Sequence, residues 1–236
     1  MKRFYKLVST HEEAEGWAIH LDAKPVKTPL KTTLLAPNEA LANEIMREWA
    51  AQEEAIIPET MPLTQILSTQ IDCVRAQRQT MSVEILKFLD TDLLCYRAPK
   101  EEPPGQAERQ AEIWDPWLDW FEEGFGQRLQ ITSGIIALKH PEAVHKAVKE
   151  KVESLDEARF TVLQLAVPLA GSLVLGLAFT QGAITPQQFY EAARVEELFK
   201  DQIYNAEKYG RDPQQEQKDA AMLRDLEAAE TFLRLL

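Results

Sequence analysis

The segment that most constrains the fold is residues 160–179, which contain no charged side chain. An uncharged run of about 20 residues is also the length of a helix that spans a bilayer. No basic cluster or aromatic belt flanks the run, as would be typical of a membrane span. It is also interrupted by polar and helix-disrupting residues, namely Gln164, Pro168, Gly171, Ser172 and Gly176. We therefore expect a central buried helix that is kinked or begins at Pro168.

The pattern around this segment is helical from residue 80 to the end of the chain. Apolar residues recur at helical spacing, with breaks at a Pro-rich stretch over residues 98–105 and at residues 210–213. The predicted helices cover residues 81–90, 107–125, 141–154, 156–181, 185–208 and 213–236.

The first 35 residues have a β pattern. Short strands are predicted over residues 4–8, 17–21 and 32–35, with a polar turn region over residues 9–16. Helices are predicted over residues 39–53, where Leu41, Ile45, Met46 and Trp49 form one buried stripe, and over residues 61–76. The expected class is α+β, with a small β-rich N-terminal domain (residues 1–76) followed by a larger all-α helical-bundle domain (residues 77–236).

The charge of the chain restricts its partners. Residues 1–80 contain 9 Lys and Arg against 11 Asp and Glu, whereas residues 81–236 contain 17 against 27. So acidic a domain repels nucleic acid and anionic membranes, and it favours a basic or amphipathic protein surface or simply keeps the helices soluble. The two cysteines, Cys73 and Cys95, have no metal-binding spacing, and the N-terminus has no signal or presequence pattern. We expect a bacterial cytoplasmic protein with buried thiols.

Catalytic motifs are missing from the sequence. It has no nucleophile elbow, phosphate-binding loop, dinucleotide fingerprint or zinc-protease motif, and only 9 glycines, so no cofactor is expected. His140 and His145 are five residues apart across Pro141, which does not place them on one helix face for a metal. Asp90 and Asp92 form a pair that suits either acid–base chemistry or the capping of a helix end, and capping is the more common role.

Three tryptophans lie within seven residues, at positions 114, 117 and 120 of a predicted helix. Their i, i+3, i+6 spacing makes successive rings neighbours. Large rings with an N–H donor occur both at the edge of a core and in binding hot spots, and we expect core packing for at least two of them. Pro116 suggests that a helix restarts here. Further along, Glu196 and Glu197 precede an amphipathic, aromatic-rich helix that fits a solvated face or a contact with a basic partner.

Taken together, these segments resemble the assembly chaperones of the ATP synthase alpha subunit. The resemblance runs over nearly the whole chain. The motifs that carry it are residues 24–29 (KPVKTP), 48–52 (EWAAQ), 61–64 (MPLT), 69–72, 90–97 (DTDLLCYR), Gln110 and 114–120 (WDPWLDW). Their order and spacing, rather than any one motif, indicate the family, whose β-rich first domain and helical second domain agree with the pattern above.

The resemblance implies a chaperone rather than an enzyme. Such a protein holds the free alpha subunit of F-type ATP synthase until it meets beta, without a cofactor, and we expect a monomer. The family's functional acid falls in an acid-acid-x-aromatic pattern that residues 196–199 match, which implies partner binding by Glu196, Glu197 and Phe199. Here the chain departs from the family, because Tyr209 replaces a tryptophan that usually follows sooner. The alternatives are a hydrolase or isomerase that uses Asp90 and Asp92 between the domains, and a general holder of hydrophobic peptides.

Overall fold

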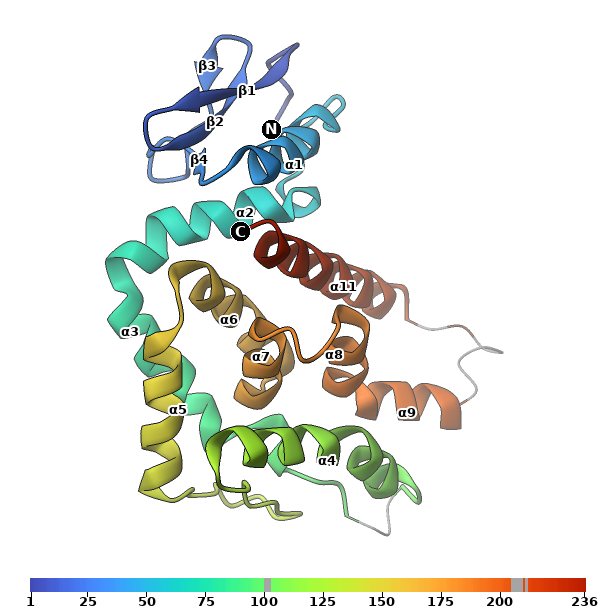
Figure 1. The fold of residues 1–236 in the computed structure, drawn as a ribbon. Coiled ribbons are helices and arrows are strands. Elements are labelled where there is room, and N and C mark those ends of the chain that lie inside the picture. The colour runs from blue at the N-terminus through green and yellow to red at the C-terminus, as the bar shows by residue number, and fades with distance from the viewer. Residues whose placement is uncertain (100–102, 205–209, 211) are drawn as a thin grey trace. The chain divides into compact units, whose positions relative to one another are not determined.

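The computed structural model describes residues 1–99, 103–204, 210 and 212–236 of the chain. They form two compact units. Unit 1 contains Met1–Arg78, Glu157–Val162 and Arg224–Leu236, and unit 2 contains Gln79–Asp156 and Leu163–Leu223. A small antiparallel sheet is followed by many helices (Figure 1), which confirms the α+β class. Unit 1 holds two late segments in addition to its N-terminal residues, and the domain division at residue 76 stays a prediction.

The sheet of unit 1 has four short strands, β1 (Val8–Glu13), β2 (Gly16–Leu21), β3 (Lys24–Pro25) and β4 (Leu35–Ala36). Their order is β1-β2-β3, β4 also pairs with β2, and every pair is antiparallel. The first strand begins at Val8, so its prediction at residues 4–8 was wrong. Polar residues form this strand because they pair with β2 along its whole length, from Val8 opposite Leu21 to Glu13 opposite Gly16.

Helix α1 (Glu39–Ala50) packs against β1 and β2. Asn38 caps it, since its side-chain oxygen accepts from the N–H of Leu41 at 2.9 Å. The predicted apolar stripe is buried at Leu41 and Ile45 and only partly buried at Met46 and Trp49. The helix ends three residues before the predicted end.

The chain continues through η1 (Pro58–Thr60), α2 (Pro62–Thr69), a π-helical segment η2 (Gln70–Val74) and α3 (Arg75–Leu86). The predicted helix at 61–76 therefore contains the π-helical segment, and α3 spans the gap that was predicted between it and the helix at 81–90. Glu48 caps α2 by accepting from the N–H groups of Leu63 and Thr64 at 2.6 and 2.8 Å. In η2, the buried Asp72 accepts from the Thr28 hydroxyl at 2.7 Å, which fixes the segment after β3.

The remaining elements are the turns η3 (Lys87–Leu89) and η4 (Leu93–Cys95) and the helices α4 (Gln106–Phe125), α5 (Glu142–Ser154), α6 (Glu157–Ala170), α7 (Leu173–Thr180), α8 (Pro186–Ala193), α9 (Val195–Ile203) and α11 (Pro213–Arg234). Two predicted helices are each divided in two. Gly171, at φ +67°, separates α6 from α7, and Arg194 separates α8 from α9. Pro116 lies inside α4, so the predicted restart there was wrong.

The uncharged segment forms most of α6 and all of α7 except its last residue, Thr180. Every residue of α7 is buried, and Pro168 lies inside α6 rather than at its start. A Cβ atom on Gly176 would lie 2.4 Å from a methyl carbon of Val167, so α7 packs against α6 where only glycine fits. Within the described ranges, no helix has the length and hydrophobicity needed to cross a membrane.

Candidate functional site

The three candidate partner-binding residues lie together on α9. Glu196 and Glu197 occupy its first turn, where the helix dipole favours negative charge. Phe199 is partly buried and lies next to Gly105, since a Cβ atom there would be 3.4 Å from its ring. The helix packs against α4, which carries the tryptophan cluster.

Glu196 is tied to the interior of unit 2. Its carboxylate accepts a hydrogen bond from the Nε2 atom of Gln110 at 2.6 Å. Gln110 is fully buried on α4, and its own carbonyl oxygen accepts from the N–H of Ala98 at 2.7 Å. Glu196 therefore joins α9 to α4 and to the segment after η4, in addition to any contact with a partner.

Glu197 is partly exposed. Its side chain is 44% exposed and lies 3.2 Å from the guanidinium of Arg194. Arg194 also lies 3.4 Å from Asp219 on α11, and this carboxylate accepts from the Tyr190 hydroxyl at 3.0 Å. The carboxylate of Glu197 thus lies at the edge of a polar network formed by Arg194, Asp219 and Tyr190.

Two apolar residues at the end of α9 were not among the predicted site residues. Ile203 and Tyr204 are exposed, and together with Pro103 and Lys200 they line a cavity of about 460 Å³. The amphipathic pattern of the helix was the signal for them, but it does not distinguish an exposed apolar side chain from a buried one. Tyr209, the residue at which the chain departs from the family pattern, lies outside the described residues.

The tryptophan cluster positions α8 and α9. Trp114 is fully buried, and its indole N–H donates to the carbonyl of Ala192 at 2.7 Å, near the end of α8. The Arg97 guanidinium lies 5.1 Å from the centre of the Trp114 ring and 2.7 Å from the Asp115 carboxylate. Trp117 and Trp120 are only partly buried. The expected core role therefore applies fully to one ring of the three.

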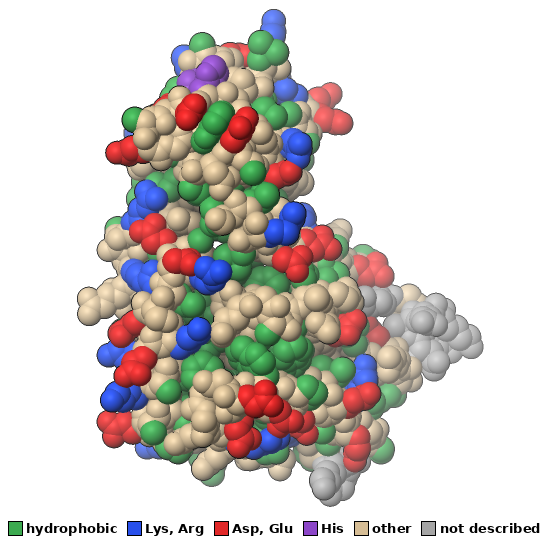
Figure 2. All heavy atoms as spheres, in the orientation of Figure 1, with side chains coloured by type: hydrophobic (Ala, Val, Ile, Leu, Met, Phe, Trp, Pro, Cys, Tyr) green, Lys and Arg blue, Asp and Glu red, His purple; other side chains and the backbone are tan. Residues whose placement is uncertain are grey.

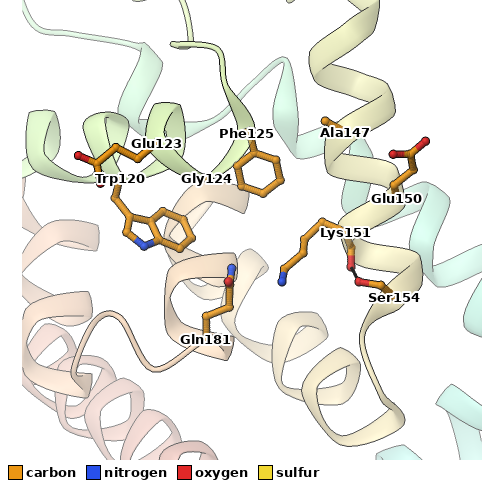
Figure 3. A pocket seen from close by; sticks show the side chains of 9 residues that line it. All are labelled: Trp120, Glu123, Gly124, Phe125, Ala147, Glu150, Lys151, Ser154 and Gln181. Carbon is orange, nitrogen blue, oxygen red and sulfur yellow. Dashed lines mark hydrogen bonds between the residues drawn. The ribbon is translucent and has the colours of Figure 1, made fainter.

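Trp120 lines a cavity of about 630 Å³ within unit 2 (Figure 3). Phe125 on α4, Lys151 on α5 and Gln181 after α7 form its other walls, and Glu123 and Glu150 lie at its edge. The cavity has acidic, basic and aromatic groups on its walls, and this mixture does not indicate one class of ligand.

Asp92 is not available to a substrate. Its side chain is fully buried and accepts from the N–H groups of Leu94 at 3.1 Å and Val174 at 2.9 Å, and from the Ser172 hydroxyl at 2.7 Å. It thus caps η4 and accepts hydrogen bonds from the N-terminus of α7. Burial raises the pKa of Asp92 to about 6, although these hydrogen bonds oppose the shift.

Asp90 has a different surrounding from Asp92. Its carboxylate lies 3.0 Å from the Nε2 atom of His145 and accepts from the backbone N–H of His140 at 3.3 Å. The two aspartates therefore serve separate structural networks, and they do not form a facing acid pair. Across the described ranges, no three His, Cys, Asp or Glu side chains lie close enough together to hold a metal ion.

Both cysteines are free thiols. Cys95 is buried as expected, and burial raises the pKa of its thiol well above the ordinary value. Cys73 is only partly buried, which corrects the expectation that both thiols are buried.

Comparison with known proteins identifies the family. A model of the ATP12 chaperone protein family matches residues 2–122, just over half of the chain. Atp12 from Paracoccus denitrificans, a solved structure, is 37% identical with a TM-score of 0.83, and the match covers 99% of this chain and 97% of that one. The chain belongs to the ATP12 chaperone family. This confirms the resemblance to the chaperones of ATP synthase assembly.

Two further proteins support membership in the ATP12 family. A structure from Agrobacterium tumefaciens, described as a candidate chaperone, is 34% identical with a TM-score of 0.85, and the match covers 99% of this chain and 85% of that one. The mitochondrial protein atp12 of Schizosaccharomyces pombe is 25% identical over 197 residues, which are 79% of this chain and 68% of that protein. The ATP12 family match at residues 2–122 ends before α9, so it does not test Glu196, Glu197 or Phe199.

The motifs in unit 1 that indicated the ATP12 family gather around one apolar cavity of about 720 Å³. The first motif contributes Pro29, the second Trp49 and the third Met61, and Asp72 closes one side. Their hydrogen bonds, such as those of Glu48 and Asp72, hold the walls of this cavity together. A structural role is sufficient to explain these motifs.

Proposed function

We propose that this chain binds the free alpha subunit of F-type ATP synthase, prevents its aggregation and releases it for assembly with beta. The observation that carries the proposal is membership in the ATP12 chaperone family, supported by similarity to P. denitrificans Atp12 over 99% of the chain. The alpha subunit is the client that the motif resemblance implies.

The physical basis of this activity is mass action. A free alpha subunit exposes the surface that later contacts beta, and exposed apolar surface of this kind aggregates. A chaperone that covers the surface lowers the concentration of the aggregating species without consuming energy. Release follows when beta competes for the same surface with higher affinity.

The proposed contact surface includes Glu196, Glu197 and Phe199 on α9. Glu197 is proposed to pair with a basic client residue, because its side chain is 44% exposed and its contact with Arg194 holds the carboxylate at the surface. Glu196 has a positioning role through Gln110. The exposed Ile203 and Tyr204 extend the same helix with apolar area.

We further propose that the chain acts without catalysis or a cofactor, as a monomer in the bacterial cytoplasm. The ATP12 family is a chaperone family, and the acidic character of the chain disfavours nucleic acid and membrane partners. The hydrolase or isomerase alternative required a pair of facing acids, and the burial of Asp92 leaves it without that pair. We therefore propose no second function.

The direct test uses purified alpha subunit and the tagged full chain. We expect co-purification of the two proteins and a concentration-dependent fall in light scattering when alpha is diluted from denaturant. An unrelated acidic protein of similar size serves as the control. If the chain neither retains alpha nor lowers its aggregation more than the control does, the proposed function is wrong.

Charge variants on α9 test the proposed surface. Glu197→Lys should weaken alpha binding by about tenfold, which is about 1.4 kcal/mol, with little change in melting temperature. Glu216→Lys is the matched control, because Glu216 is an exposed acid in the first turn of α11. Glu196→Gln keeps an oxygen acceptor for Gln110 and separates charge from hydrogen bonding. If Glu197→Lys and Glu196→Gln both bind alpha as well as the unaltered chain does, α9 is not part of the contact surface.

A further inference from the structure

The connection between α4 and α5 has an exposed apolar tip. Ile135 is 100% exposed and Ile136 is 82% exposed, and Ile131 on the approach is also exposed. Residues 129–138 carry no charge, although 27% of the chain is charged. Single exposed apolar residues are common on protein surfaces, but two adjacent, highly exposed isoleucines in an uncharged loop are the pattern of an interaction site.

The loop is held in place, despite its exposed tip. The N–H of Thr132 donates to the carbonyl of Cys95 and its carbonyl accepts from the N–H of Arg97, both at 2.8 Å. On the other side of the tip, the N–H of Leu138 donates to the Tyr96 hydroxyl at 3.1 Å. The Tyr96 hydroxyl in turn donates to the carbonyl of Asp90 at 2.8 Å.

The ends of the loop are fixed as well. Arg128 at its start pairs with Asp119 and Glu122 on α4, and the N–H of His140 at its end donates to the Asp90 carboxylate. The anchoring groups on the other side of these bonds come mainly from residues 90–97, the most specific family motif. An anchored loop loses little conformational freedom on binding, so the burial of its tip contributes more of its free energy to affinity.

Charges next to the loop select the kind of partner. Helix α4 carries six acidic residues and one arginine. When Arg97 and Arg128, which pair with it, are counted, an excess of three negative charges remains. Figure 2 shows acidic side chains over α4. An anionic membrane would be repelled, and a two-fold contact with a second copy would bring the acidic helices close together.

We infer that residues 131–138 form a docking loop whose Ile135 and Ile136 insert into an apolar patch, bordered by basic side chains, on the client protein. The inference rests on the proposed function, because it takes the free alpha subunit as that client. Residues 90–97 are positioning residues for the loop. They hold it rigid, and the isoleucines make the contact.

The test measures binding of purified alpha subunit to the full chain and to the double variant Ile135→Ser/Ile136→Ser. We expect the Kd to rise at least about tenfold with an unchanged melting temperature, because burying one isoleucine is worth more than a tenfold change in Kd. The matched control is Leu7→Ser/Leu30→Ser, which removes two exposed aliphatic side chains from unit 1 (72% and 69% exposed). Tyr96→Phe, which removes the hydroxyl that holds Leu138, should weaken binding less than the double variant does.

The possible outcomes separate this inference from the proposed function. If the unaltered chain does not bind alpha, the proposed function fails and the inference fails with it. If the unaltered chain and the double variant bind alpha equally, or the Leu7/Leu30 control weakens binding as much, only the docking loop is refuted. Two other results would also refute it. One is isoleucine-dependent sedimentation with phosphatidylglycerol vesicles, and the other is an isoleucine-dependent dimer in light scattering.

Discussion

Replacing Asp92 by asparagine tests whether desolvation or hydrogen bonding has the larger effect on the pKa of this fully buried carboxylate. The side chain is 0% exposed and accepts hydrogen bonds from Leu94, Ser172 and Val174. Desolvation disfavours the ionised form and the hydrogen bonds favour it, and the pKa of about 6 indicates that desolvation is larger. Because the folded state holds the proton more tightly than the unfolded state, the stability contribution of Asp92 is complete below pH 3.8 and is lost as the pH rises through about 6.

The size of this pH effect follows from the shift. At about 1.4 kcal/mol per pKa unit, complete ionisation of Asp92 costs about 3 kcal/mol, and about half of that cost arises between roughly pH 5 and 7.5. Asparagine has the same shape but does not ionise. It keeps one oxygen for Leu94 and Ser172, and it loses the acceptor for Val174, which costs about 1–3 kcal/mol at every pH. The difference in unfolding free energy between the unaltered chain and Asp92→Asn should therefore shift in favour of the variant as the pH rises.

Urea unfolding of both proteins at several pH values measures this difference, and urea adds no ionic screening. Asp22→Asn is a matched control. Asp22 is exposed at a left-handed φ of 56°, which asparagine tolerates, and N–H groups of Leu7 and Lys6 lower its pKa. It stays ionised across pH 5 to 7.5, so its variant should show no such trend. If the disadvantage of Asp92→Asn grows as the pH rises, the hydrogen bonds outweigh desolvation and the reasoning is refuted.

Three further outcomes are expected. Trp114→Phe should lower the unfolding free energy by about 1–3 kcal/mol in urea titration, because the buried Ala192 carbonyl loses its indole donor; an unchanged midpoint would contradict that bond. Gly176→Ala should lower the melting temperature, since its Cβ would lie 2.4 Å from Val167, while Gly124→Ala, which has open space, should not. Burial lowers the pKa of His140, and the positive charge of His145 adds to this while Asp90 opposes it. The stability that His140 contributes should therefore fall as the pH drops below about 6.5, because the unfolded state then takes up the proton. His140→Leu should flatten this part of the curve of stability against pH. Melting temperatures measured at a series of pH values would show the difference.

The sequence predicted the elements whose signals are local. The stripe of Leu41 and Ile45 and the position of β2 were correct, because burial on one face imposes a period that can be read from the residues themselves. The division of residues 156–181 at Gly171 and the pairing of the polar strand β1 were missed. The pairing of β1 depends on what the strand packs against. Gly171 and Ser172 were recognised as interruptions of the apolar run, but the sequence did not show that one helix ends there and that Ser172 caps the next.

The candidate site shows the same limit. The resemblance indicated Glu196 as a candidate. The hydrogen bond between Glu196 and Gln110 spans 86 residues of sequence, and no local pattern predicts it. The apolar loop had a signal, the uncharged run of residues 129–138. Hydrophobicity alone does not distinguish a buried isoleucine from an exposed one, so that run alone indicated no contact surface.

By itself, the sequence determined the α+β class, the acidic charge that restricts partners, and the ATP12 family, because composition, periodicity and ordered motifs are properties of the chain. The tertiary structure decided what the most recognisable residues do. Asp92 is buried beneath the N-terminus of α7, and Asp90, Tyr96 and Arg97 hold an apolar loop whose tip is exposed. The reason is physical: the dielectric environment and hydrogen-bond partners of a side chain are set by segments distant in sequence, and they decide whether an aspartate is a cap, an anchor or an acid.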